Sequence, residues 1–157
     1  MSYIMNLRQK IGHERILSVA CGAIIENENE EILLQLRSDT HMYGTPGGNM
    51  ELGETLIDTL LREVKEETNL VLDPKDIQLF AVYSGEKSLL IYPNLDEVQY
   101  VHFIYHVKVK GKLDLKTDTE SLVLNFFKRE DIPKNLMPND KLWIHKWQNA
   151  DFTLIVD

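Results

Sequence analysis

Residues 47–70 read GGNMELGETLIDTLLREVKEETNL, a glycine-rich start followed by a run with helical periodicity. Three glutamates in this run, Glu63, Glu66 and Glu67, are three or four residues apart and therefore neighbours on a helix. At an effective dielectric constant of about 20 and a separation of roughly 5 Å, each like-charged pair costs on the order of 3 kcal/mol. The stretch predicts a helix whose carboxylates need a compensating positive charge.

Spacing alone leaves two interpretations of this acidic helix open. In the first, the glutamates form a hydrated helix face, relieved by Lys65 and by an Arg62–Glu66 pair, as most surface charge clusters are. In the second, they bind hard divalent cations, which prefer several carboxylate and carbonyl oxygens. The glycine-rich turn favours the second, because glycine lets backbone carbonyls approach a metal and backbone amides approach a phosphate at a helix N-terminus.

The order of these residues resembles the Nudix box, G-x5-E-x7-R-E-U-x-E-E-x-G-U, where U is aliphatic. The box spans residues 48–70, and its matching positions are Gly48, Glu54, Arg62, Glu63, Val64, Glu66, Glu67 and Leu70. Asn69 replaces the family's second glycine, but asparagine also tolerates the left-handed conformation that ends a helix. The runs LLQLRSD (33–39), TPGG (45–48) and FFKREDIP (126–133) also look like Nudix domains.

The resemblance implies a pyrophosphohydrolase that cleaves a nucleoside diphosphate linked to another moiety by attack of water on phosphorus, with Mg²⁺ or Mn²⁺ bound to the box. It further implies that Arg62 orients the box carboxylates and that Glu54 supports them. The catalytic group expected from the resemblance is Glu63, Glu66, Arg62 and Glu54. The metal ligands expected from it are Glu63, Glu67, Glu66 and the backbone carbonyl of Gly47.

The general base is less narrowly defined, because the family takes it from a box glutamate or from an acid on another loop. The candidates are Glu63, Glu97 and Glu120. The last two lie in polar connections that can border the cleft, so they are also counted as candidate substrate-binding residues; ordinary hydrated loop acids are an equal alternative.

Two further residues are candidates for substrate binding. Arg37, at the end of a predicted strand, suits a phosphate, although an exposed surface arginine is an equal alternative. Tyr43 suits stacking on a nucleobase, as do Tyr83, Tyr92 and Phe127, but aromatic side chains more often lie in the core. His102 and His106 are interpreted as a half-exposed sheet face, because a glutamate-rich site for a hard cation needs no imidazole.

The periodicity predicts an α/β (α+β) fold. Strands are predicted at 16–25, 32–36, 77–83, 98–109 and 122–127, the first two as a hairpin, and helices at 55–68 and 139–148. Ser2 and Gly12 suit the ends of a short helix, so 1–12 is predicted as an N-terminal helical extension. This mixture favours an α/β/α sandwich with a mixed sheet, as in Nudix proteins, and the length predicts one domain over 1–157.

Composition restricts the partners. The net charge of −8 disfavours nonspecific binding to nucleic acid or an anionic membrane. Cys21 is the only cysteine, which excludes an internal disulfide and favours a reducing compartment. The apolar stretch 16–25 is too short to span a bilayer, and the first residues lack a secretory leader. We therefore expect a cytoplasmic protein without a membrane partner.

The expected partner is a small nucleotide-derived substrate. ADP-ribose, a nucleoside triphosphate, an oxidised nucleotide and a dinucleoside polyphosphate stay open, because sequence periodicity does not place the loops that form the pocket. Two alternative functions are a Nudix-like module that binds or senses a nucleotide without cleaving it, and decapping of RNA ends. The complete set of box acids favours catalysis over sensing. The N-terminal segment and the sheet edges are compatible with a homodimer.

Overall fold

Two long parallel strands form the centre of the fold in the computed structural model, which describes residues 2–157. Strand β1 (Ile16–Glu26) pairs with β7 (Glu97–Lys108) in unbroken parallel register, from Ile16 opposite Val98 to Glu26 opposite Lys108. Parallel strands at the centre of a sheet are covered on both faces, which explains the nearly continuous apolar sequence of β1. All but two of its residues are buried.

Nine strands among the described residues form one mixed sheet, as predicted. The main order is β3-β2-β1-β7-β5-β9, with β2 at Ile32–Arg37, β3 at Tyr43–Gly44, β5 at Gln78–Tyr83 and β9 at Ile155–Val156. Three strands lie off this path: β4 (Gly47–Asn49) pairs with β1, β6 (Leu89–Ile91) with β7, and β8 (Ser121–Phe127) with β2. The predicted hairpin is short, since β1 and β2 pair at Glu26 and Ile32, whereas β2 pairs along its length with β8.

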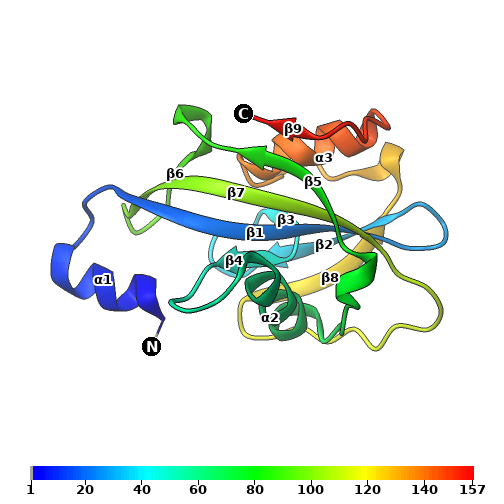
Figure 1. Cartoon of the computed structure of the whole chain (residues 1–157), viewed down its shortest axis with the longest axis horizontal. Coiled ribbons are helices and arrows are strands. Elements are labelled where there is room, and N and C mark those ends of the chain that lie inside the picture. The colour runs from blue at the N-terminus through cyan, green and yellow to red at the C-terminus, as the bar shows by residue number, and fades with distance from the viewer. Residues whose placement is uncertain (1) are drawn as a thin grey trace.

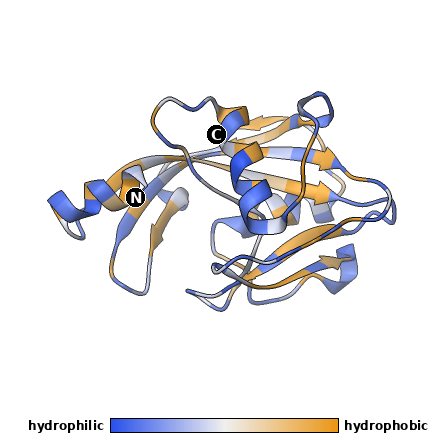
Figure 2. Cartoon of the chain, turned by 90° about the horizontal axis from the view of Figure 1, so that it is seen from below, coloured by the Kyte–Doolittle hydropathy of each residue, from blue (hydrophilic) through white to orange (hydrophobic). Residues whose placement is uncertain are grey.

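Helices α2 (Leu56–Thr68) and α3 (Asp140–Gln148) lie on opposite faces of this sheet and complete the predicted α/β/α sandwich (Figure 1). Single turns of 3₁₀ helix occur at Pro74–Asp76, Glu86–Ser88 and Arg129–Asp131. Figure 2 shows apolar residues concentrated on the strands and polar residues on many of the connecting loops. No helix in residues 2–157 combines the length and the apolar character needed to cross a membrane.

Local sequence fixes both ends of α2. Thr55 and Asp58 form a capping box at its start, and Asn69 ends it in the left-handed conformation at φ 66°. Leu60 and Val64 are fully buried in the core on this face of the sheet. The acidic residues of α2 are therefore held in a fixed position relative to β1 and β4.

The N-terminal helix α1 (Tyr3–Ile11) forms as predicted, with Ser2 as its N-cap and Gly12 as its C-cap. Its apolar side chains Ile4, Leu7 and Ile11 pack against a separate core cluster that includes Val98 and Tyr100 of β7. In Figure 1 α1 lies at one end of the sheet, beyond the start of β1.

The interpretation of His102 and His106 as a half-exposed face is wrong. His102 is 9% exposed and the His106 side chain 12%, because α3 and the C-terminal segment cover this part of β7. The His102 ring lies 5.0 Å from that of Trp143, and the His106 ring lies 5.3 Å from that of Phe152.

Candidate active site

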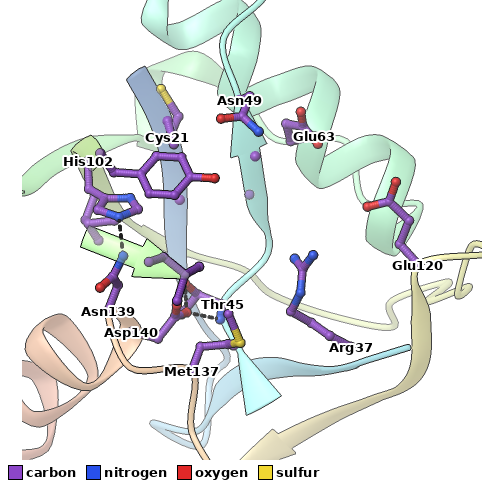
Figure 3. Close-up of a pocket in the computed structure, with 18 of the residues that line it drawn as sticks. Cys21, Arg37, Thr45, Asn49, Glu63, His102, Glu120, Met137, Asn139 and Asp140 are labelled. Carbon is purple, nitrogen blue, oxygen red and sulfur yellow. Dashed lines mark hydrogen bonds between the residues drawn. The ribbon is translucent and has the colours of Figure 1, made fainter. Parts of the chain in front are cut away.

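A cavity of about 300 Å³ lies between β4, the acidic side of α2 and the start of α3 (Figure 3). Its charged lining includes Arg37, Glu51, Arg62, Glu63, Glu66, Glu120 and Asp140. The lining also contains the backbone of Gly47 and Gly48 and the side chains of Tyr92, Tyr100, His102 and Trp143. The cavity therefore joins an acidic wall with glycine backbone to a wall of aromatic and neutral polar groups.

Two glycines bring the backbone of β4 against the acidic helix. At Gly47, where φ is 153°, an added Cβ would lie 2.2 Å from the carbonyl oxygen of Cys21 on β1. At Gly48, an added Cβ would lie 2.5 Å from the carboxylate of Glu63. The Gly47 amide donates to Glu67 Oε2 at 2.7 Å. Glycine is thus required at Gly47 for β4 to lie close to β1, and at Gly48 for the Glu63 carboxylate to lie against the backbone of β4.

Arg62 connects the acids of the box. Its Nε and Nη2 donate to the two oxygens of Glu54 at 2.6 and 3.0 Å. Its Nη1 donates to Glu63 Oε1 at 2.7 Å and to Glu66 Oε2 at 3.3 Å. Nη2 also donates to the carbonyl of Asn49 at 3.0 Å. One guanidinium therefore joins three carboxylates to the strand that carries the glycines.

The environments of these acids differ, and so do their pKa values. Hydrogen bonds from Arg62 lower the pKa of Glu54 to about 2. Burial raises the pKa of Glu63 despite the contact with Arg62, and burial raises the pKa of Glu67 to about 8, opposed by the Gly47 amide. Glu67 is 2% exposed and the Glu63 side chain 15%, whereas the Glu66 side chain is 57% exposed. A hydrated helix face describes Glu66 but not Glu63 or Glu67.

The donor atoms at this wall fit a hard divalent cation. Carboxylates of Glu63, Glu66 and Glu120 line the same cavity, and oxygen donors are those that Mg²⁺ and Mn²⁺ prefer. In residues 2–157 no three His, Cys, Asp or Glu side chains stand in ready ligand geometry. Glu63 and Glu66 are both paired with the guanidinium of Arg62. A cation at this wall would compete with Arg62 for these two carboxylates.

Arg37 and Glu120 reach the cavity from other elements. Arg37, the last residue of β2, donates through Nε and Nη2 to the carboxylate of Asp39 at 3.0 and 2.8 Å. Glu120 precedes β8, and its charge contributes to the raised pKa of Glu63. Figure 3 shows Arg37, Glu63 and Glu120 around the same space. This end of the cavity therefore combines the guanidinium of Arg37 with carboxylates from two separate segments of the chain.

The sequence matches the NUDIX domain family model over residues 17–147, which is more than half of the chain. The chain belongs to the NUDIX family. The match contains β4, α2, Arg37 at the end of β2 and Glu120, so the cavity, apart from Ser2, is lined by residues of the shared domain. Helix α1 lies before it.

Three relatives show the range of this Nudix chain's similarity. It is 30% identical over 138 residues to an ADP-ribose pyrophosphatase of Methanocaldococcus jannaschii, covering 85% of this chain and 76% of the relative. It is 29% identical over 126 residues to an 8-oxo-dGDP phosphatase of Mus musculus, covering 76% of this chain but 35% of that longer protein. The solved MutT protein of Methanosarcina mazei shares the fold at a TM-score of 0.71, with 23% identity, 89% of this chain and 99% of that chain covered. This Nudix chain is a hydrolase of a family that includes pyrophosphatases.

Four residues predicted for the Nudix site do not line the cavity. Glu54 and Glu67 lie behind the lining, where they contact Arg62 and the Gly47 amide. Tyr43 packs edge-to-face on Phe127, with ring centroids 5.3 Å apart, in the core on the α3 side. Glu97 pairs with Arg15 at 2.9 Å at the start of β7. Arg37, Gly47, Arg62, Glu63, Glu66 and Glu120 are the predicted residues that the fold brings to the cavity.

The wall opposite the acidic helix contains residues that sequence reasoning did not select. Asp140 Oδ1 accepts from the Thr45 amide at 2.6 Å and from the Thr45 hydroxyl at 2.8 Å, and Trp143 Nε1 donates to the same hydroxyl at 3.0 Å. The Asn139 amide lies 3.1 Å from His102 Nε2. These contacts form two neighbouring polar groups along the cavity wall, one around Thr45 and the other between Asn139 and His102.

Burial sets the charge of these two polar groups. It lowers the pKa of His102 to about 4 and raises the pKa of Asp140 to about 6. At neutral pH His102 is therefore an uncharged imidazole. The sequence signal for this wall is the pair Asn139-Asp140 at the start of the predicted helix 139–148, which indicates a helix start but not a site.

Proposed function

We propose that this Nudix hydrolase is a metal-dependent pyrophosphohydrolase that cleaves a nucleoside diphosphate linked to another moiety. One observation carries the proposal: Glu63, Glu66, Glu120 and Arg37 line a single cavity beside the glycine backbone of β4. Hydrolysis of a diphosphate needs positive charge to offset the charge of the phosphates and a carboxylate base to accept a proton from water. The shared cavity of Arg37 and these glutamates supports the proposal on both points.

The acidic wall is the proposed cation site. Mg²⁺ or Mn²⁺ would be held by Glu63, Glu66, Glu67 and the Gly47 carbonyl, and it would supply charge neutralisation and a lowered pKa for bound water. Arg62 and Glu54 act as positioning residues, since their ion pair fixes the guanidinium that contacts Glu63. Arg37, which also lines the cavity, would contact a phosphate oxygen.

The proposed reaction is the hydrolysis of one phosphoanhydride bond. The oxygen of a water molecule bonds to one phosphorus, and the bond between that same phosphorus and the bridging oxygen breaks. Glu120 or Glu63 accepts the proton released by water, and the bridging oxygen leaves with the second phosphate. The products are two phosphate compounds, one of them a nucleoside phosphate.

The wall formed by β7 and α3 is the proposed nucleoside end. His102, Asn139 and Asp140 offer hydrogen-bonding groups, and Trp143 and Tyr100 offer aromatic surface next to them. Such a combination suits a flat heterocycle with polar edges. The acidic net charge of the chain favours a small nucleotide over a long RNA as substrate. Its single cysteine is consistent with a cytoplasmic enzyme, and its length of 157 residues is consistent with one domain.

A substrate panel tests the proposed function. The protein is incubated with Mg²⁺ or Mn²⁺ and with nucleoside diphosphates, triphosphates, dinucleoside polyphosphates and diphosphate sugars, and the products are identified by mass. We expect metal-dependent cleavage of at least one diphosphate compound, with a loss of 100-fold or more in kcat for Glu63→Gln. Glu86→Gln, which lies outside the cavity, is the matched control and should keep full turnover. Saturable nucleotide binding without cleavage under either metal would instead indicate a sensing module.

A further inference from the structure

A second cavity of about 300 Å³ adjoins the candidate active site, between α1 and the turn that joins β6 to β7. Its lining is Ile4, Arg8, Asp39, Asn49, Tyr92, Pro93, Asn94, Asp96, Val98 and Tyr100. Asn49, Tyr92 and Tyr100 line both cavities, so the two spaces meet at these three side chains. The volume is at the lower end of the range of small-molecule sites, about 300–1,000 Å³.

Helix α1, which supplies one wall of this cavity, precedes residue 17, where the family match begins. The helix is fixed to the active site at its start, because the Tyr3 amide donates to Glu51 Oε2 at 2.8 Å and Glu51 lines the first cavity. Ile4 packs against the same cluster as Val98 and Tyr100. These contacts fix the position of α1 and therefore the shape of the second cavity.

Arg8 is held in a fixed position at the wall of this cavity. Its side chain is 9% exposed, and its terminal nitrogens donate to the carbonyls of Gly12, Glu14 and Glu97 at 3.1, 2.6 and 2.8 Å. These contacts fix the guanidinium. Its Nε is buried without a hydrogen-bond partner, with Asp96 Oδ1 3.6 Å away. A buried donor of this kind is costly unless a ligand or water accepts from it.

The charges around the second cavity are balanced in pairs. Arg8 lies beside Asp96, and Asp39 accepts two hydrogen bonds from Arg37 of the first cavity. The remaining polar groups are neutral, including the hydroxyls of Tyr92 and Tyr100, which lie 2.8 Å apart. A ligand with a terminal phosphate would bring about two negative charges into a site that already holds two carboxylates. The lining suits a neutral polar ligand better.

We propose that the second cavity binds a neutral, hydroxyl-rich sugar carried on the distal phosphate, so that the substrate is a nucleoside diphosphate sugar rather than a nucleoside triphosphate. Sugar hydroxyls both donate and accept, which matches the carboxylates of Asp39 and Asp96 and the hydroxyls of Tyr92 and Tyr100. Ile4, Pro93 and Val98 offer apolar surface to the C–H face of the ring. This inference rests on the proposed function, because it assigns the far end of the same substrate.

The reaction remains a single hydrolysis. Water adds to one phosphorus of the diphosphate, the bridging P–O bond breaks, and the products are a nucleoside monophosphate and a sugar phosphate. The sugar stays in the second cavity beside Tyr92 and Tyr100 while the diphosphate lies in the first cavity. The subsite binds and orients the substrate and takes no part in bond breaking.

The test compares kcat/KM for ADP-ribose, ADP and ATP in the full chain. We expect ADP-ribose to exceed ATP by at least about 10-fold. Ile4→Trp, which fills the cavity, should lower the ratio of ADP-ribose to ADP by at least about 10-fold. Met5→Trp is the matched control on the same helix, because Met5 is 57% exposed, and the ratio should stay as in the wild type. Urea unfolding of both variants measures whether the substitutions destabilise the fold.

A second variant keeps the inference testable if Ile4→Trp does not fold. Asn94 is an exposed residue in the turn that borders the cavity, and Asn94→Lys adds a positive charge there. We expect this change to raise kcat/KM for ATP relative to ADP-ribose. The sugar subsite is overturned if the wild-type protein cleaves ATP as well as or better than ADP-ribose and if both variants leave the substrate ratios of kcat/KM unchanged. That result leaves the proposed pyrophosphohydrolase activity intact. An absence of cleavage of every diphosphate compound overturns both.

Discussion

Arg62 and Glu54 form a two-point ion pair, with Nε to Oε1 at 2.6 Å and Nη2 to Oε2 at 3.0 Å. Eight residues separate them, and the pair connects the loop before α2 to the middle of the helix. Because Arg62 also contacts Glu63 and Glu66, this geometry decides where two cavity carboxylates point. The planar guanidinium is suited to this role, and a lysine ammonium is not.

Replacing Arg62 by lysine should therefore destabilise the fold. Lysine keeps the charge but cannot contact both Glu54 oxygens, Glu63 and the Asn49 carbonyl together. We expect the free energy of unfolding in urea to fall by about 1–3 kcal/mol. Arg15→Lys, at an arginine that is 53% exposed and paired with Glu97, is the matched control and should change it by less than about 1 kcal/mol. Equal losses of unfolding free energy in both variants would show that the Arg62 contacts stabilise the fold no more than an exposed ion pair does.

The contact between Gly48 and Glu63 predicts a kinetic effect of one methyl group. In Gly48→Ala the new Cβ would meet the Glu63 carboxylate at 2.5 Å, so the carboxylate must move. We expect kcat to fall at least about 10-fold, as a misplaced group costs catalysis more than stability. Gly111→Ala, at a φ of 75° with no atom near the new Cβ, controls for backbone strain and should keep its kcat.

The general base can be assigned by comparing two loop acids. Glu120 lines the cavity, whereas Glu97 pairs with Arg15 outside it. If Glu120 accepts the proton from water, Glu120→Gln should lower kcat by about 10²–10⁴-fold, and Glu97→Gln should leave it unchanged. A pH–rate profile separates this role from a structural one, because removal of the base also removes the acidic limb of the profile. Full activity in Glu120→Gln would assign the role to Glu63.

Asp140 predicts a defined pH dependence of stability. Burial raises its pKa from 3.8 to about 6, so the folded state binds an extra proton in this range and stability falls as pH rises from about 4 to 6. Burial lowers the pKa of His102 from 6.5 to about 4, which has the opposite effect: stability falls as pH falls from about 6.5 to 4. The two contributions oppose each other in the same window.

Asp140→Asn removes one of these contributions. The amide can still accept from Thr45 but does not titrate. Relative to the wild type, its free energy of unfolding should increase by on the order of 1–3 kcal/mol between pH 4 and 7. Urea unfolding at several pH values measures this difference. A difference that is constant with pH would show that Asp140 titrates at its ordinary value in the fold.

The acidic helix was predictable from sequence because its signals are local. The period of Leu60 and Val64, the cap at Thr55 and the left-handed end at Asn69 all lie within one segment of the chain. The same holds for α1, whose caps Ser2 and Gly12 flank it directly. Short strands gave no such signal: β6 has three residues, and its pairing depends on β7.

The opposite wall of the cavity was not predictable in this way. Thr45 and Asp140 are 95 residues apart, and only the packing of α3 on the sheet brings them together. His102 is on a strand with an alternating pattern, which indicates two faces but not which helix covers them. Tyr43 illustrates the same point, because an aromatic residue next to the glycine loop points to the core rather than the cavity.

Binding of Mn²⁺ tests the central claim most directly, since the account requires the α2 carboxylates to hold a divalent cation. Titration of the protein with Mn²⁺, followed by the electron paramagnetic resonance signal of the free ion, counts the bound ions without any substrate. We predict saturable binding in the wild type, competed by Mg²⁺ and weakened at least about 10-fold in Glu63→Gln. Identical Mn²⁺ binding in the wild type and in Glu63→Gln would contradict the account.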